Sequence, residues 1–112
     1  MRDYINIGPA PAEEDCAQVG QDNFYERARA EGRAFINLIR RTLGDEPDGA
    51  LLKLKGFPHD FGTYYEVVCY YEEDNRAAFE YALRCEAEAP YRWDDEARQE
   101  LKAAGFPVNA DI

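Results

Sequence analysis

The sequence has a single histidine and only three cysteines, Cys16, Cys69 and Cys85, and no C-x-x-C pair. A structural zinc site needs four ligands at suitable spacing, so we expect no metal site of this kind. The odd number of cysteines also argues against a disulfide framework. Because Cys69 falls in an apolar strand pattern and Cys85 in a helical one, we expect both to be small core residues.

Long apolar runs are missing too. No stretch of 18 apolar residues is present, which excludes a predicted membrane-spanning helix. The first eight residues contain too few apolar side chains for a signal peptide, so we expect a cytoplasmic protein. Basic residues are outnumbered, 13 Lys and Arg against 23 Asp and Glu, which gives a net charge of -10. Such a charge repels phosphate backbones, so we expect no direct nucleic-acid binding and no membrane binding.

Motifs that hold a nucleotide or calcium are also absent: the sequence contains no Walker A motif, no GxGxxG and no EF-hand spacing. His59-Asp60 is the one pair of neighbouring residues that resembles part of a catalytic site, and neither Ser nor Cys lies near it in the sequence. We expect a turn, in which Asp60 accepts hydrogen bonds from nearby backbone N–H groups. The sequence therefore predicts a non-enzymatic protein with no cofactor and no catalytic residue. A small enzyme or ligand-binding module that uses the His59 loop is the alternative.

Hydrophobic periodicity predicts one domain, residues 1–112, with the order β-α-β-β-α-α. The expected strands are 3–7, 50–56 and 63–71, and the expected helices are 23–43, 75–89 and 94–104. Residues 9–22 are interpreted as an acidic connection and residues 106–112 as a loose tail. Because 63–71 is the longest and most apolar strand, we place it in the middle of the sheet.

The predicted fold is α+β: a two-layer sandwich in which helices cover one face of a three-stranded antiparallel sheet, an incomplete ferredoxin-like arrangement. A loop over 57–62 would place Lys53 opposite Glu66. Alternation then directs Leu52, Leu54, Val67 and Cys69 to the helices. The open face carries Tyr4, Tyr64, Glu66 and Tyr70.

Two apolar helix faces are expected to pack on the sheet. In helix 23–43 the stripe includes Gly32, and close packing of the backbone would explain a glycine there. In helix 75–89 the expected inner face consists of Ala78, Phe79, Ala82, Leu83 and Cys85.

Acidic residues are concentrated in the predicted connections. The turns 44–48 and 72–74 each carry a charge of -3, whereas helix 23–43 carries +3. Both turns should lie at the same end of the sheet and form one acidic patch, Asp45, Glu46, Asp48, Glu72, Glu73 and Asp74. Such a patch suits a protein partner with a basic surface, although acids also serve solubility. Tyr64, Glu66 and Tyr70 are further candidate partner-binding residues, because aromatic side chains anchor protein interfaces.

The stretch from Phe57 to Tyr71, FPHDFGTYYEVVCYY, resembles a segment of small, uncharacterised acidic proteins of phages and other bacterial mobile elements. The stretch from Ala87 to Asp94 is similar as well. In size and charge the chain is also similar to anti-CRISPR and anti-restriction inhibitors. The resemblance implies a bacterial host cell and no particular residue role.

Taken together, these features favour an inhibitor from a mobile element whose acidic surface blocks a basic, nucleic-acid-binding site of a host defence complex. A housekeeping accessory protein that forms a homodimer through the open sheet face is another alternative.

Overall fold

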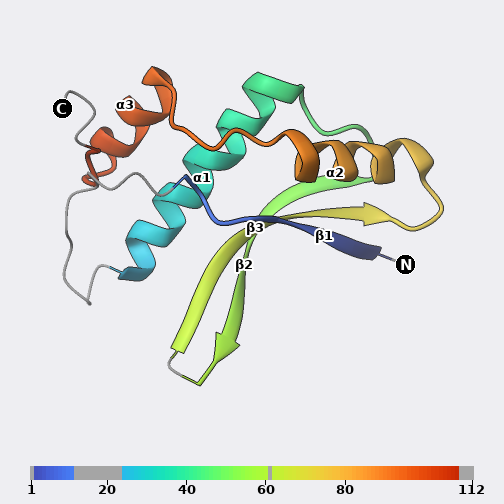
Figure 1. Cartoon of the computed structure of the whole chain (residues 1–112), viewed down its shortest axis with the longest axis horizontal. Coiled ribbons are helices and arrows are strands. Elements are labelled where there is room, and N and C mark those ends of the chain that lie inside the picture. Colours follow the sequence, from blue (N-terminus) through green and yellow to red (C-terminus); the bar gives the residue numbers. More distant parts are fainter. Residues whose placement is uncertain (1, 12–23, 61, 109–112) are drawn as a thin grey trace.

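The computed structural model describes residues 2–11, 24–60 and 62–108 (Figure 1). Its elements are β1 (Arg2–Gly8), α1 (Phe24–Leu43), β2 (Ala50–His59), β3 (Gly62–Glu72), α2 (Arg76–Glu88) and α3 (Asp95–Ala103). The three strands form an antiparallel sheet in the order β1-β3-β2. The α+β fold, the element order and the central position of 63–71 are therefore confirmed.

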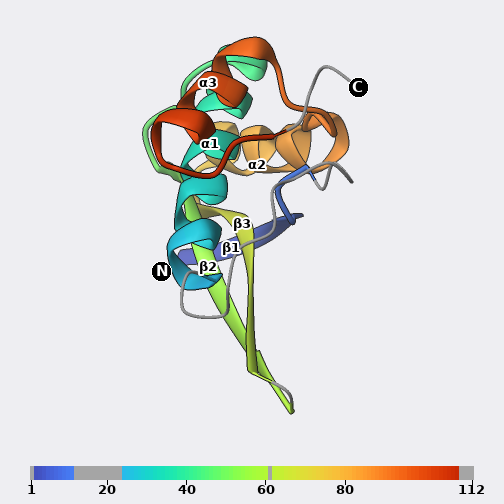
Figure 2. The same cartoon turned by 90° about the vertical axis from the view of Figure 1, so that its left-hand side faces the viewer.

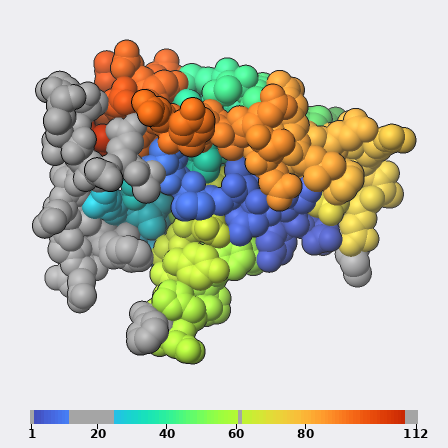
Figure 3. Space-filling model, in the orientation of Figure 1, coloured from blue at the N-terminus to red at the C-terminus, as the bar shows by residue number. Residues whose placement is uncertain are grey.

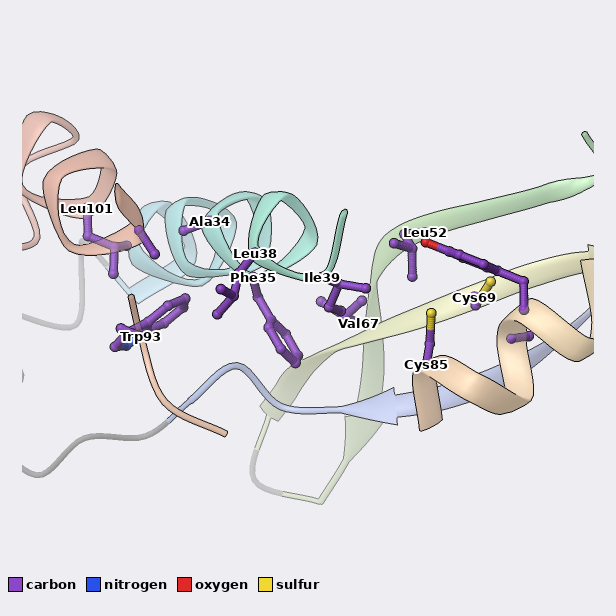
Figure 4. Close-up of a cluster of buried hydrophobic side chains, with 13 residues drawn as sticks. Ala34, Phe35, Leu38, Ile39, Leu52, Val67, Cys69, Cys85, Trp93 and Leu101 are labelled. Carbon is purple, nitrogen blue, oxygen red and sulfur yellow. The ribbon is translucent and has the colours of Figure 1, made fainter. Parts of the chain in front are cut away.

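Helices α1 and α2 lie on the same face of the sheet, and α3 packs on α1 (Figures 1 and 2). Between them is a continuous apolar core, shown in Figure 4, to which α1 contributes Phe35, Leu38 and Ile39. Trp93 holds α3 to α1, with its ring edge-on to Phe35 at a centroid distance of 6.5 Å. None of the helices among the described residues is long and apolar enough to cross a bilayer.

The predicted register between β2 and β3 is wrong. Lys53 lies opposite Val68, and Lys55 lies opposite Glu66. The predicted loop 57–62 is wrong too, because the strands stay paired as far as His59 and Gly62. The longer ladder is stabilised by the stacked rings of Phe57 and Tyr64, whose centroids are 5.4 Å apart.

The face of each strand is nevertheless as predicted, because the register differs by an even number of residues and side chains alternate. Leu52, Val67 and Cys69 are buried in the core with the helices. The far end of the β2–β3 hairpin extends beyond the rest of the molecule (Figures 1 and 3).

The inner face of α2 differs from the prediction. Phe79 and Leu83 are exposed, and the buried residues are Ala78, Tyr81, Ala82 and Cys85. Tyr81 was not predicted to be buried. Its hydroxyl donates a hydrogen bond of 2.7 Å to the carbonyl oxygen of Gly44, just beyond α1. This bond satisfies the polar end of a large ring, which is why a tyrosine can occupy a core position here.

Gly32 is confirmed as a site of close packing. A Cβ at this position would lie 2.8 Å from Cδ1 of Leu54 in β2. The missing side chain thus lets α1 approach the sheet, which offsets the low helix propensity of glycine.

A loose tail was predicted over 106–112. Its described part, residues 106–108, is held to the rest of the protein. The N–H of Phe106 donates to the carbonyl oxygen of Leu101 at 2.9 Å, and Val108 packs against the core. Residues 109–112 lie outside the described residues, as does most of the acidic connection 9–22. Of that connection, Ala10 packs against the core and Pro11 is buried.

Candidate protein-binding surface

The structure joins the two acidic turns at one end of the sheet. The side chain of Asn75 donates to the carbonyl oxygen of Asp48 at 2.9 Å. The N–H of Glu72 donates to the carbonyl oxygen of Gly49. Asn75 also caps α2, because its side-chain oxygen accepts from the N–H of Ala78 at 3.1 Å. The six predicted acids therefore lie on two hydrogen-bonded segments.

Glu46 does not belong to the exposed patch. Its carboxylate forms a bidentate pair with Arg40, at 2.6 and 2.8 Å, and accepts from the N–H of Leu52 at 3.1 Å. Burial alone would raise the pKa of this carboxyl, but the hydrogen bonds from Arg40 and the backbone outweigh burial and hold the pKa below its ordinary value. Glu46 is thus a structural anion that fastens the turn to α1 and β2.

Four acids of the predicted patch are free of any such role. Asp45, Asp48, Glu73 and Asp74 are exposed, and no ion pair involves them among the described residues. Glu72 is half-buried and pairs with Arg2 at 3.4 Å. We call the four exposed residues the acidic end.

An apolar groove adjoins the acidic end, and sequence reasoning missed it. It has a volume of about 600 Å³ and is lined by Tyr71, Phe79 and Leu83 with Glu73, Asp74, Arg76 and Glu80. Phe79 is 37% exposed and Leu83 41%. The centroids of the Tyr71 and Phe79 rings are 5.1 Å apart. The signal available in the sequence was that α2 carries more apolar residues than can face the sheet, since Phe79 and Leu83 lie beside the buried face.

The open face of the sheet holds the other predicted residues, Tyr64, Glu66 and Tyr70. The rings of Tyr4 and Phe57 are 6.5 Å apart, although their partners on β3, Tyr70 and Tyr64, would be about 20 Å apart on a flat sheet. The sheet must therefore curve toward its open face, so that this face is concave.

Within this concave face Lys55 and Glu66 already have partners. The ammonium of Lys55 lies 5.2 Å from the ring centre of Tyr4 and 5.8 Å from that of Phe57. Glu66 accepts a hydrogen bond of 2.8 Å from Asn6. Val68, at the middle of the open face, is completely buried. Of the predicted residues only Tyr64 is well exposed, at 44%. The concave face therefore provides less accessible surface for a partner than the sequence suggested.

His59 belongs to the same aromatic row. Its ring lies 5.4 Å from that of Tyr64, close to the exposed end of the hairpin. Among the described residues, no group of three His, Cys, Asp or Glu side chains is arranged to hold a metal ion.

The buried thiols are not suited to nucleophilic chemistry. Burial raises the pKa of Cys69 to about 12 and also raises that of Cys85. Both are core residues, as predicted. Cys16 lies outside the described residues.

Comparison of the chain with protein-family models, with curated proteins and with solved structures found no match.

Proposed function

We propose that this protein acts by binding another protein, and that the acidic end with its adjoining apolar groove is the contact surface. The finer hypothesis is that the partner is a host defence complex of a bacterium and that the surface blocks its nucleic-acid-binding site. The observation that carries the proposal is the exposed apolar groove, with Phe79 and Leu83, directly beside Glu73 and Asp74.

The two parts of this surface have complementary roles in binding. Large apolar side chains in a central groove supply most of the affinity of a typical interface. Acids at the rim select a partner of opposite charge and accelerate its approach. A surface of acids alone would serve solubility equally well, whereas exposed Phe79 and Leu83 do not help solubility.

A basic, nucleic-acid-binding surface is the partner that fits best. Such surfaces are rich in Arg and Lys, because they must neutralise phosphates. The acidic end presents Asp45, Asp48, Glu73 and Asp74 where the phosphates of a nucleic acid would otherwise lie. Binding should therefore compete with the nucleic acid and weaken as the salt concentration rises.

The experiment uses the whole protein as bait in a bacterial lysate, with quantitative mass spectrometry of the captured proteins. The wild type is compared with two variants, Glu73→Lys/Asp74→Lys and Phe79→Ala/Leu83→Ala. We expect one captured protein or complex to be reduced at least about tenfold with each variant, which corresponds to about 1.4 kcal/mol. Added DNA or RNA should displace the same prey from the wild type.

The matched control is Glu26→Lys/Glu86→Lys, which makes the same change in net charge at two other exposed acids. This control should retain the prey. Prey that binds all four baits alike would contradict the contact surface. Prey that depends on the surface but is not displaced by nucleic acid would leave protein binding intact and contradict the blocking of a nucleic-acid site.

A further inference from the structure

Strand β2 is an edge of the sheet, and its outer backbone groups are directed away from β3. The N–H of Leu52 donates to the Glu46 carboxylate instead of to β3. Since backbone direction alternates along a strand, the N–H and C=O groups of Leu54 and Gly56 also point outward. Pro58 has the same parity, so its missing N–H costs no hydrogen bond within the sheet. No strand among the described residues pairs with this edge.

Beside this edge lie three cations that have no acidic partner among the described residues. Seven arginines of the described chain each form an ion pair, at positions 2, 27, 40, 41, 76, 84 and 98. Six bases form none among the described residues, although the chain has 23 acids to 13 bases; Arg29, Arg33 and Lys53 lie together at this edge, and the other three are Lys55, Arg92 and Lys102. Arg29 instead lies over the ring of Tyr25 at 5.7 Å. Positive charge therefore accumulates at this edge of an otherwise acidic protein.

The three cations line one groove between α1 and β2. The groove has a volume of about 440 Å³, and Ile36 and Leu54 supply apolar surface within it. Arg29 and Arg33 come from α1, on the helix side of the sheet. Lys53 lies opposite Val68 and is exposed, so its side chain is on the open side. The groove thus presents cations on both sides of an unpaired strand edge. We call it the basic groove.

We propose that the basic groove binds an extended acidic segment of another protein, which pairs with β2 as a fourth strand. Side chains of an added strand alternate between the two sides of a sheet. Acids on one side would meet Arg29 and Arg33, and acids on the other side would meet Lys53. The outward N–H and C=O groups of Leu54 and Gly56 would supply the main-chain hydrogen bonds.

Charge decides between this occupant and two others. A second copy of the chain paired through β2 would bring like charges together across the edge, which is unfavourable. A nucleic acid would be repelled by the net charge of -10 and would have no use for outward amide groups. A short peptide is governed mainly by the charges within a Debye length of about 8–10 Å. Among the described residues, the groove is lined by Arg29, Arg33, Arg40 and Lys53 and by no acid. The inference is independent of the acidic end and of its proposed partner.

The test measures binding of a fluorescent peptide with a repeating Glu-Glu-Val-Val pattern, which places acids on both sides of an extended strand, by anisotropy with the whole chain. The wild type should bind it, and Arg29→Glu/Arg33→Glu should weaken binding at least about tenfold. The control Arg92→Glu/Lys102→Glu makes the same charge change at two exposed cations and should bind like the wild type. A peptide N-methylated at alternate residues keeps its charge but cannot pair as a strand, so its binding should also fall at least about tenfold. Amide hydrogen exchange at Leu54 and Gly56 should slow when the unmodified peptide binds.

Equal binding of the N-methylated peptide would show a charge-only contact and overturn strand addition. Tighter binding of an oligothymidylate than of the peptide would identify the groove as a nucleic-acid site and overturn the proposal as well. Failure of the wild type to bind the peptide at about millimolar concentration would do the same. Circular dichroism of each variant shows whether its fold is retained, which the exposed positions of Arg29 and Arg33 favour.

Discussion

Glu46 has a different role in the structure from the one that the sequence predicted. It lies in a run of acids and was predicted to face a partner, yet its side chain is only 9% exposed and is held by Arg40. A carboxylate in this position fixes three segments, namely the end of α1, the following turn and the start of β2. Removing it would leave Arg40 and the N–H of Leu52 without their partner.

We expect Glu46→Gln to lower the free energy of unfolding at pH 7 by about 1–3 kcal/mol. Because the pKa of Glu46 is lower in the folded state, its contribution is fully present above the ordinary value of 4.5 and is lost as the pH falls through the folded value. Urea unfolding at a series of pH values should therefore show a difference between variant and wild type that is constant near neutrality and narrows below about pH 4.5. The exposed substitution Glu86→Gln should stay within about 0.5 kcal/mol of the wild type. A difference that persists unchanged to pH 3 would contradict the assignment.

The two core thiols should be unreactive in the native protein. Only the thiolate attacks alkylating reagents, and the pKa of Cys69, at about 12, leaves almost none at neutral pH. In a Cys16→Ser variant we expect Cys69 and Cys85 to react with iodoacetamide at least about a hundredfold more slowly than an exposed thiol. Mass spectrometry with and without denaturant measures both rates. Rapid labelling of both cysteines without denaturant would contradict their burial.

The connections between elements depend on a few polar contacts at their ends. Asn75 both caps α2 and holds the turn that precedes β2, while Asp94 caps α3 and pairs with Arg41 of α1. Each such residue serves two elements at once. The turns of the acidic end are consequently fixed relative to each other.

We expect Asn75→Ala to lower the free energy of unfolding by about 1–2 kcal/mol, since it removes the cap of α2 and the bond to Asp48. Asn75→Asp retains the capping oxygen but loses the amide donor, so it should cost less than Asn75→Ala. Chemical unfolding of the three proteins gives the comparison. Equal losses for the two variants would mean that the bond to Asp48, and not the cap, stabilises this junction.

Considered as a whole, the molecule consists of a packed body and a projecting hairpin end (Figures 1 and 3). The body contains the apolar core, with Val67, Val68 and Cys69 completely buried. The hairpin end has stacked aromatic rings but exposed residues at 58, 59, 60, 62, 63 and 64. Stability should therefore be unevenly distributed along the same two strands.

Amide hydrogen exchange should reveal this difference. We expect the N–H groups of Phe57 and Tyr64 to exchange at least about a hundredfold faster than those of Val67 and Cys69, because the hairpin end can open without exposing the core. Low concentrations of urea should accelerate exchange at the core positions and have little effect at the hairpin end. Similar protection along the whole of β3 would mean that the hairpin opens only with the body.

Several parts of the fold could be predicted from the sequence because they depend on local patterns. Period-two and helical periodicity identified six elements, and the apolar character of 63–71 placed it in the centre. The faces of β2 and β3 were correct although the register was not, since a shift of two residues returns each side chain to the same side. The alternation of side chains in β3 also predicted that Cys69 is buried, and the helical spacing of apolar residues predicted that Cys85 is buried.

Other features depend on contacts between segments that are distant in the sequence, and only the tertiary structure determines them. The pairing of Lys55 with Glu66 follows from how far the hairpin extends, which the stack of Phe57 on Tyr64 helps to decide. Whether Phe79 is buried depends on the orientation of α2 over the sheet. Local patterns specify which residues can form an element and which face is apolar. Which side chains meet across the molecule depends on packing. In this fold the packing leaves Phe79 and Leu83 exposed and places Arg29, Arg33 and Lys53 along the edge of β2.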